Sequence, residues 1–553
     1  MPACRLSRRH LLQTAAALPL PGLFSAANSA HAHPAVQPAD TSKSFAYAET
    51  PAGRFRGQRR IDNGVQFYKG IPFIQNPYLP ERRFLSPVPV EPFEDTLDCG
   101  LPGAIPLQPD AKGGMVGGNG PLCLNIWAPE DAQAGMNLPV MVWVPGGGSI
   151  RCDQNDPRFD GNSFALNGII LVTLAYRVNI DGFLKIEGGD SNLGIRDIIA
   201  GLTWVKQNIA GFGGDPDRIT AFGQSAGGTH LVDVIASPAA RGLLSGAIIQ
   251  SPSAVAQWKD ESEADRAAEI VARALGASPT RESLMTVPFE KLAAIGPLSA
   301  KLAADLDWAQ FTHGNTSLFK GWIDQDSGGI MPERPVEAIA RGACAGLNVI
   351  AGSTASEWRY YIVPNGRIDK LKRKDAEKLL LGANRPISLY ESYERAGKGR
   401  TPGDIFAQIQ SDIIFRMPCV KLLESLAAGG ANVWAYDFAW QSPVLGQSGA
   451  VIGAAHTTDV PFVFKTFKAP KAIATNGRHA PTSLADTMHG AWATFAKTQT
   501  APWATFNLGK RRAMRFDVQS TEVADPWAFE RMTLPAICTD YLINKLSRRN
   551  PVG

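Results

Sequence analysis

Residues 218–228 read Arg-Ile-Thr-Ala-Phe-Gly-Gln-Ser-Ala-Gly-Gly, and this stretch decides the fold. Arg218 to Phe222 is typical of a short buried strand, and Gly228 to Ile235 is predicted to open a helix. Between them, residues 223–227 match the pattern G-x-S-x-G, which places a serine on a sharp strand-to-helix turn. Glycine at both ends lets the backbone close up without a side chain striking the strand or the helix. The stretch therefore predicts an exposed nucleophile, Ser225, at a helix N-terminus.

Short apolar runs alternate with helix-length periodic segments on both sides of this motif. Val140–Val144 and Gly168–Ala175 are rich in β-branched residues, as expected of strands buried on both faces. In residues 192–212 the apolar side chains recur at steps of three and four, which predicts one amphipathic helix. Further strands are predicted at 347–352 and 432–438, with helical insertions at 369–428. We predict an α/β fold of the α/β-hydrolase type, with a mostly parallel central sheet flanked by helices and helical insertions forming the cleft.

The N-terminus is predicted to be an export signal. Arg8 and Arg9 precede a weakly apolar stretch, 11–24, and then Ala30-His31-Ala32, which suits a signal peptidase. The paired arginines resemble a twin-arginine signal, although an arginine pair on a buried helix is the alternative. We predict a bacterial export signal at 1–32, a linker at 33–43 and a single catalytic domain at 44–553. The mature protein is then expected in the periplasm or outside the cell.

Composition removes several classes of function. The 55 basic and 51 acidic residues give a net charge of +4, with no basic stripe interleaved with aromatics, so nucleic-acid binding is not indicated. No apolar run reaches the roughly 18 residues that a membrane span needs. The seven cysteines include no C-x-x-C pair and no accompanying histidine cluster, so we predict neither a metal nor a cofactor.

A serine nucleophile needs a base, and the base needs an acid to fix its tautomer. In this fold the chain order is serine, acid, histidine. His456 follows an apolar segment, in a loop beyond a predicted strand, and Glu357 follows the strand that ends at Gly352. Position in the sequence alone does not establish Glu357 as the acid, because Asp and Glu are common on loops. The other histidines outside the N-terminus are interpreted as hydrogen-bonded core or surface residues: His230, His313, His479 and His489.

Three consecutive glycines follow the strand that ends at Val144. Gly146, Gly147 and Gly148 offer backbone amides free of side chains, and the amide of Ala226 lies directly after the nucleophile. Such donors form an oxyanion hole, which stabilises the charge of the transition state. A flexible turn is the alternative, but the position after a buried strand argues against it.

Ordered matches along nearly the whole mature chain carry a family resemblance. They lie at 67–73, 123–127, 176–178, 192–194, 212–216, 222–228, 247–251 and 459–464. With these motifs the chain resembles the type-B carboxylesterases, a family that also contains the cholinesterases and the non-catalytic neuroligins. The resemblance implies that Glu357 and His456 complete a triad with Ser225, and that Gly147, Gly148 and Ala226 are the oxyanion donors.

The chain departs from the family pattern at a few positions. Pro145 stands where a histidine usually precedes the glycines, and Gln224 replaces the usual glutamate before the nucleophile. Trp358 replaces a glycine after the acid and is predicted to narrow the substrate pocket. Cys123 matches a family cysteine that bonds an upstream partner, and despite a displaced Cys99 we predict a Cys99–Cys123 disulfide.

The predicted reaction is two-step acyl transfer on a small-molecule ester, through an acyl-enzyme at Ser225. Three arginines flank the glycine loop and the acid in the sequence: Arg151, Arg158 and Arg359. If one of them points into the cleft, it could pair with a carboxylate of the substrate and so favour acidic esters. The alternative for each is a solvated surface arginine; Arg151 is the predicted substrate contact.

Two other functions are compatible with parts of this pattern. The same triad serves amides, carbamates and lactones. A neuroligin-like binding protein is disfavoured, because its members typically lose the nucleophile that Ser225 supplies here. The oligomeric state is left open by the sequence.

Overall fold

The computed structural model of the protein describes residues 44–535 apart from 111–113, 254–258, 293–294, 296–318, 320, 326–327 and 383–384. The predicted export signal and linker at 1–43 lie outside the described residues. Within the described ranges, no helix is long and apolar enough to cross a membrane.

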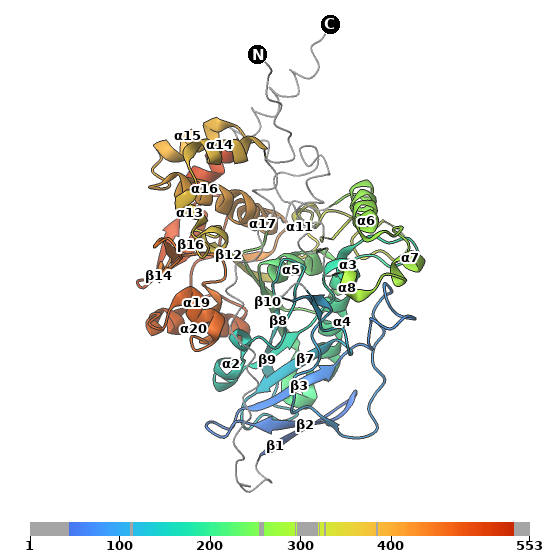
Figure 1. The fold of residues 1–553 in the computed structure, drawn as a ribbon. Coiled ribbons are helices and arrows are strands. Elements are labelled where there is room, and N and C mark those ends of the chain that lie inside the picture. The colour runs from blue at the N-terminus through green and yellow to red at the C-terminus, as the bar shows by residue number, and fades with distance from the viewer. Residues whose placement is uncertain are drawn as a thin grey trace.

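A large central sheet forms the middle of the molecule (Figure 1). Its strands, in spatial order, are β1 (Phe45–Thr50), β2 (Gly53–Arg59), β3 (Gln66–Pro72), β7 (Cys123–Ala128), β9 (Ile170–Leu174), β8 (Leu138–Val144), β10 (Gly214–Gln224), β11 (Gly246–Gln250), β12 (Asn348–Thr354), β13 (Asn432–Phe438), β16 (Arg512–Phe516) and β17 (Thr521–Ala524), with β4 (Leu97–Asp98) beside β2. Every neighbouring pair from β9 to β16 is parallel. The pairs at both ends are antiparallel, apart from the short parallel pair of β4 with β2. The predicted α/β-hydrolase sheet is confirmed.

Alternate residues of the central strands bury into two different cores, because successive side chains of a strand point to opposite faces. Val140, Val142 and Val144 of β8 belong to the larger cluster, whereas Met141 and Trp143 belong to the second. The larger cluster is covered by α4 (Leu193–Asn208) and α5 (Ala226–Ala236), and the second by α18 (Val460–Phe464) and α20 (Thr482–Thr498). Both faces of β8 are therefore buried from solvent, as its continuous apolar sequence predicts.

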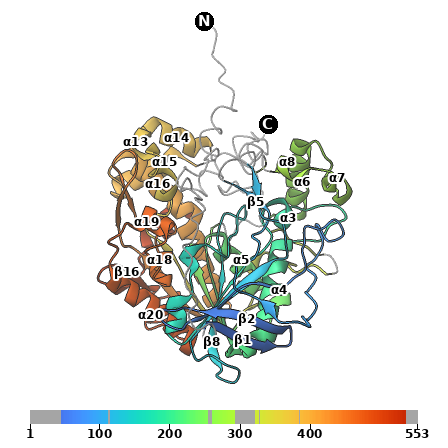
Figure 2. The same ribbon diagram turned by 60° about the horizontal axis from the view of Figure 1, so that its bottom comes forward.

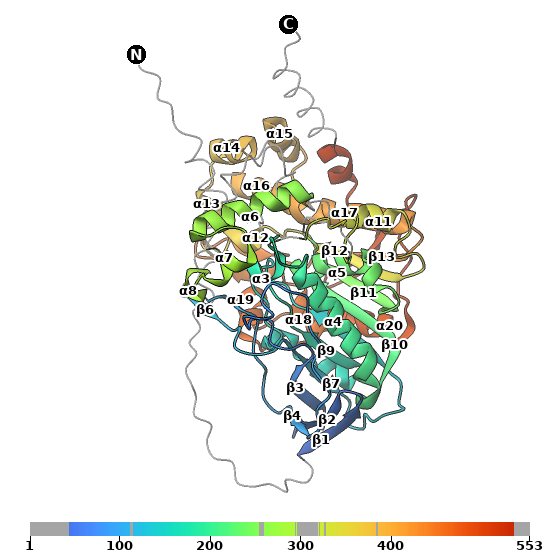
Figure 3. The ribbon, with the colours of Figure 1, turned by 90° about the vertical axis from the view of Figure 1, so that its right-hand side faces the viewer.

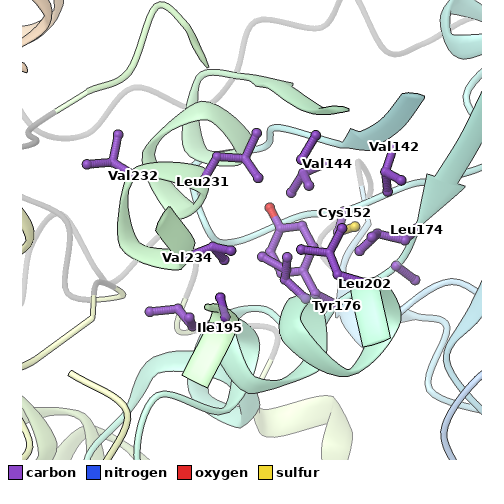
Figure 4. Close-up of a cluster of buried hydrophobic side chains, with 14 of the residues drawn as sticks. Val142, Val144, Cys152, Leu174, Tyr176, Ile195, Leu202, Leu231, Val232 and Val234 are labelled. Carbon is purple, nitrogen blue, oxygen red and sulfur yellow. The ribbon is translucent and has the colours of Figure 1, made fainter. Parts of the chain in front are cut away.

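The figures show these two layers. Figure 2 places α18, α19 (Pro470–Asn476) and α20 on one side of the sheet and α4 and α5 on the other. Figure 4 shows Val142 and Val144 of β8 in one cluster with Leu202 of α4 and Leu231 of α5. The predicted helix at 192–212 is α4 followed by a 3₁₀ turn, Ile209–Phe212.

The predicted insertion at 369–428 is a set of helices. It contains α14 (Arg373–Gly382), α15 (Ile387–Arg395), α16 (Pro402–Ser411) and α17 (Met417–Ala428), with a π-helical turn at Asp412–Arg416 between the last two. Figures 1 and 3 place α14, α15 and α16 at the end of the molecule opposite β1 and β2. Helix α16 packs against α12 (Arg359–Ile362), the short helix that follows β12.

The predicted Cys99–Cys123 disulfide is wrong. Both cysteines are free, buried thiols, and their Sγ atoms donate to local carbonyls, those of Leu97 at 3.7 Å and Pro121 at 3.5 Å. Strand β3 holds them at different levels: Lys69 donates its amide to the carbonyl of Cys99, whereas Cys123 pairs with Pro72. Burial raises the pKa of both thiols to about 12.

A buried ion pair ties the end of β9 to α4. Arg177 and Asp197 have no exposed side-chain surface, and two guanidinium N–H groups donate to the carboxylate at 2.8 and 2.7 Å. The backbone amide of Arg177 donates to the same carboxylate at 2.9 Å, and its Nη1 donates to the carbonyl of Leu85 at 2.7 Å. Removing one partner would leave the other charge buried and uncompensated.

We therefore expect Arg177→Leu to lower the free energy of unfolding by about 3–5 kcal/mol, measured by urea titration. The double variant Arg177→Met with Asp197→Leu should recover most of that loss. Asp217→Asn, which removes an exposed partner of Lys206, should cost less than about 1 kcal/mol. An Arg177→Leu protein with the wild-type urea midpoint would contradict this account.

Candidate active site

Ser225 lies where the sequence places it, between β10 and α5. Its φ of +60° and ψ of −127° are uncommon for a residue with a side chain. A Cβ atom added to Gly227 would lie 2.0 Å from the carbonyl oxygen of Val144, and one added to Gly223 would lie 2.8 Å from the same atom. The amide of Ser225 donates to the carbonyl of Gln250 on β11 at 2.9 Å. Both glycines are therefore required by the close approach of this turn to β8.

The glycine loop after β8 lies against the nucleophile. A Cβ atom on Gly146 would lie 3.1 Å from Cβ of Ser225. Gly147 and Gly148 are exposed, with φ angles of +143° and +66° that favour glycine. Ala226 opens α5, and the first amides of a helix have no acceptor within the helix. The loop that carries two of the predicted oxyanion donors therefore begins beside Ser225, and the third, Ala226, follows Ser225 directly in the chain.

His456 and Glu357 meet in the fold although 99 residues separate them. Nδ1 of His456 lies 2.5 Å from Oε2 of Glu357, and both side chains are buried. The second carboxylate oxygen accepts the amide of Thr354 at 2.7 Å, and the amide of His456 donates to the carbonyl of Glu357 at 3.1 Å. This pairing assigns the proton of the neutral ring to Nδ1, which leaves Nε2 as an acceptor.

Gln224 occupies the other side of the histidine ring. Its Nε2 atom lies 3.2 Å from Nε2 and 3.3 Å from Nδ1 of His456. Because the two distances differ by only 0.1 Å, the amide lies across the ring rather than at one nitrogen. Between these described residues there is no hydrogen bond from Oγ of Ser225 to His456. In free enzymes such catalytic hydrogen bonds are often long and tighten when substrate binds.

Aromatic rings surround His456, and the sequence did not single them out. The ring centroid of Phe415 lies 4.6 Å from that of the imidazole, Tyr361 5.9 Å and Tyr360 6.1 Å. The two tyrosines follow Glu357 by three and four residues, a spacing that signals one helical face. Phe415 lies in the π-helical turn, which no hydrophobic periodicity reveals.

A buried polar network lies behind the nucleophile. Oδ2 of Asp459 accepts Nε2 of Gln250 at 2.7 Å, and Oε1 of Gln250 accepts Nε1 of Trp492 at 3.2 Å. The backbone of the same Gln250 receives the amide of Ser225. Burial, with a smaller contribution from the charge of Glu357, raises the pKa of Asp459 to about 6.

The loop that carries the acid is braced from the insertion. Nη2 of Arg416 donates to the carbonyl of Ala355 at 2.7 Å. Asp412 contacts the same guanidinium and accepts the hydroxyl of Tyr393 at 3.0 Å, and burial raises the pKa of Asp412 to about 7. Nowhere in the described ranges do three or more His, Cys, Asp or Glu side chains gather so as to hold a metal ion.

Arg158 and Arg359, two of the arginines that flank the site in sequence, each bind a carboxylate. Nη2 of Arg158 lies 3.1 Å from Asp156, whose side chain is almost completely buried. Nη1 of Arg359 lies 2.5 Å from Asp404, and its other nitrogens reach backbone carbonyls of β15 (Val451–Gly453). These ion pairs give both arginines a structural role.

Arg151 and Trp358 are the two residues predicted to contact substrate. Nε of Arg151 donates to the carbonyl of Pro109 at 3.0 Å, and burial lowers its pKa, opposed by Asp110 and Tyr360. Trp358 is half-buried and packs against two small apolar clusters, and its ring centroid lies 4.7 Å from that of Tyr361 with 41° between the ring planes. Their contact with substrate remains a prediction.

An elbow serine, a buried histidine–glutamate pair and an exposed glycine loop at one edge of this sheet define the class: a serine hydrolase of the α/β-hydrolase fold. The model of the carboxylesterase family matches residues 45–527, and the chain belongs to that family. Its fold and relatives make it a carboxylic ester hydrolase, so the interpretation as a non-catalytic binding protein is set aside.

Several characterised proteins are similar to this chain. The para-nitrobenzyl esterase of Bacillus subtilis (strain 168) is 32% identical over 430 residues, 75% of this chain and 82% of that protein. The fumonisin B1 esterase of Sphingopyxis macrogoltabida is 27% identical over 476 residues, 80% of each chain. The crystal structure of a carboxylesterase of Geobacillus stearothermophilus superposes with a TM-score of 0.73 at 29% identity, covering 88% of this chain and 99% of that one.

The raised pKa of Asp459 gives a signed prediction for stability against pH. From the ordinary value of 3.8 to about 6, the folded protein holds this proton while the unfolded chain releases it. The free energy of unfolding therefore falls as the pH rises through this window. Asp459→Asn should remove on the order of 2–3 kcal/mol of that fall, measured by urea titration between pH 4 and pH 7.

Asp412 contributes a fall of the same sign up to about pH 7, so the variant retains part of the slope. Asp217→Asn, which alters an exposed carboxylate, is the matched control and should leave the curve parallel to that of the wild type. A parallel curve for Asp459→Asn as well would show that this carboxyl titrates as if it were exposed.

Proposed function

We propose that Ser225 attacks the ester carbonyl of a small-molecule substrate while His456 takes its proton and Glu357 orients the ring. The observation that carries this assignment is the 2.5 Å hydrogen bond from Nδ1 of His456 to the buried carboxylate of Glu357. That bond leaves Nε2 to accept a proton, and it stabilises the imidazolium that forms. The protonated ring then protonates the leaving alcohol, and water activated by His456 releases the acid from Ser225.

The oxyanion hole in this proposal consists of the amides of Gly147, Gly148 and Ala226. Its support is that the two glycines are exposed, that their loop lies against Ser225, and that Ala226 opens a helix whose dipole favours negative charge. Each such donor typically lowers the barrier by about 3 kcal/mol. Pro145 precedes the loop and is held by the hydroxyl of Tyr176 through its carbonyl at 2.7 Å, so the departure from histidine leaves the backbone donors in place.

We also propose that the protein is exported by a bacterial cell into the periplasm or medium. The support is the pair Arg8 and Arg9, the apolar stretch that follows and the Ala30-His31-Ala32 site. N-terminal sequencing of the mature protein tests this proposal, with Ala32 as the last residue removed.

Ser225→Ala tests the catalytic assignment. Hydrolysis of p-nitrophenyl acetate should fall by at least about 1,000-fold in kcat, because the residual rate comes from the oxyanion hole and binding alone. Ser483→Ala, on an exposed turn of α20, is the matched control and should keep the wild-type rate. Turnover of p-nitroacetanilide faster than the ester would favour the amide alternative, and a Ser225→Ala protein with more than a tenth of the wild-type kcat would exclude Ser225 as the nucleophile.

Arg151 is proposed to favour esters that carry a second carboxylate. It lies three residues after the glycine loop, and its charge acts on Tyr360, whose ring packs against His456. A guanidinium near the site would pair a substrate carboxylate. Wild type should therefore prefer p-nitrophenyl hydrogen succinate to p-nitrophenyl butyrate, which has the same acyl length without the charge.

Arg151→Ala should lower kcat/KM for the succinate by about 10-fold and leave the butyrate within twofold, since a charge-assisted bond contributes about 1.5–3 kcal/mol. Arg395→Ala removes an exposed arginine on α15 and should change neither rate. Equal losses for both esters in Arg151→Ala would assign the residue to the structure of the loop instead.

A further inference from the structure

A second hydrogen-bonded serine and histidine lie behind the glycine loop. Ser149 closes that loop, and its Oγ lies 3.0 Å from Nε2 of His230 on α5. Nδ1 of the same ring lies 3.4 Å from Oδ2 of Asp233 on the same helix. All three residues are buried, with 5%, 2% and 2% of their surfaces exposed. These residues form the same sequence of groups as the catalytic triad, a hydroxyl, an imidazole and a carboxylate. None of the three takes part in the proposed mechanism.

Burial excludes a second nucleophile here. The ring of Phe183 stacks on His230 at 4.6 Å with 13° between the planes, and Tyr176 packs edge-on at 5.4 Å. A substrate carbonyl cannot reach Oγ of Ser149 without displacing this packing. The arrangement is therefore suited to holding the backbone in place.

The backbone at Ser149 needs such support. Its φ is +59°, in the left-handed region that residues with a side chain rarely adopt. Its carbonyl accepts the amide of Asn179 at 2.7 Å, and its hydroxyl reaches His230. At the other end of the loop, Tyr176 donates to the carbonyl of Pro145 at 2.7 Å. Hydrogen bonds at Pro145 and at Ser149 therefore fix both ends of the loop that contains the exposed glycines.

The Ser149–His230 bond also spans the two segments that carry the proposed oxyanion donors. His230 follows Ala226 by four residues, about one turn of α5. With Nδ1 donating to Asp233, Nε2 must accept, so the hydroxyl of Ser149 is the donor. One hydrogen bond thus joins the glycine loop directly to the first turns of the nucleophile's helix.

We propose that Ser149, His230 and Asp233 form a buried positioning relay that fixes the glycine loop relative to α5. The relay keeps the amides of the loop and of the helix start directed at one oxyanion. This inference rests on the proposed oxyanion hole. Misplacement of a catalytic group by about 1 Å can cost about 100-fold in rate, so a loosened loop would slow the chemical step.

Ser149→Ala and His230→Phe test the relay, with rates expressed per active site titrated by a fluorophosphonate. The phenyl ring keeps the packing against Phe183 and removes the acceptor. Both variants should lose about 10–100-fold in kcat for p-nitrophenyl acetate, with KM within twofold of the wild type. Affinity for a trifluoromethyl ketone, which forms an oxyanion on the enzyme, should fall by the same factor. The matched methyl ketone should bind as before.

Further variants separate an effect on positioning from an effect on stability. His230→Gln keeps an acceptor for Ser149 and should restore most of kcat, and the double variant Ser149→Ala with His230→Phe should be no slower than the slower single variant. His489→Phe removes a histidine of α20 that is equally buried, and should lower stability without changing kcat per site. If His230→Phe does not fold, Ser149→Gly serves instead, because it relieves the left-handed backbone and should be stable but slow.

The outcomes are distinct. Wild-type kcat per titrated site in both Ser149→Ala and His230→Phe, or equal effects of His230→Phe and His489→Phe on kcat, would overturn the relay while the esterase assignment stands. A wild-type protein that neither reacts with the fluorophosphonate nor turns over esters would overturn the proposed mechanism and the relay together.

Discussion

The contact between the end of β8 and the start of α5 is the constraint on which the site depends. The carbonyl of Val144 comes so close to Gly227 that a single added carbon would lie 2.0 Å away. That approach forces Ser225 into its uncommon backbone conformation and places the glycine loop beside it. The two segments that carry the proposed nucleophile and oxyanion donors are therefore adjacent because no side chain separates them.

The sequence predicted those parts of the site where both the residue type and its spacing are constrained by the chemistry or by close backbone contacts. Ser225 and the glycines of the elbow and loop belong to this group, because only glycine permits the close backbone contacts around them. The strands were predicted for the same kind of reason: β8, β12 and β13 are short apolar runs buried on both faces. Strand β10 begins at Gly214, four residues before the predicted Arg218, because an irregular register with β8 extends the pairing.

Residues that act only through tertiary contacts were missed. Phe415 packs on His456 from a helical insertion that sequence periodicity does not reveal. His230 is a buried, hydrogen-bonded histidine, within the interpretation given to it from the sequence, but its partner Ser149 could not be identified because 81 residues separate the two. The error over Cys99 and Cys123 has the same origin. Family spacing suggested a bond, but the pairing along β3 sets where each thiol lies, and pairing is not visible in one sequence.

Cys99 and Cys123 are two of several buried free thiols in the described part of the chain, and these thiols can serve as internal probes of unfolding. Alkylating reagents attack the thiolate, and burial raises the pKa of Cys99, Cys123, Cys152 and Cys419, so in the closed fold these thiols are both shielded and protonated. Cys123 lies on β7, Cys152 beside the glycine loop and Cys419 on α17. The order in which they become labelled would record the order in which the antiparallel edge, the oxyanion side and the helical insertion come apart.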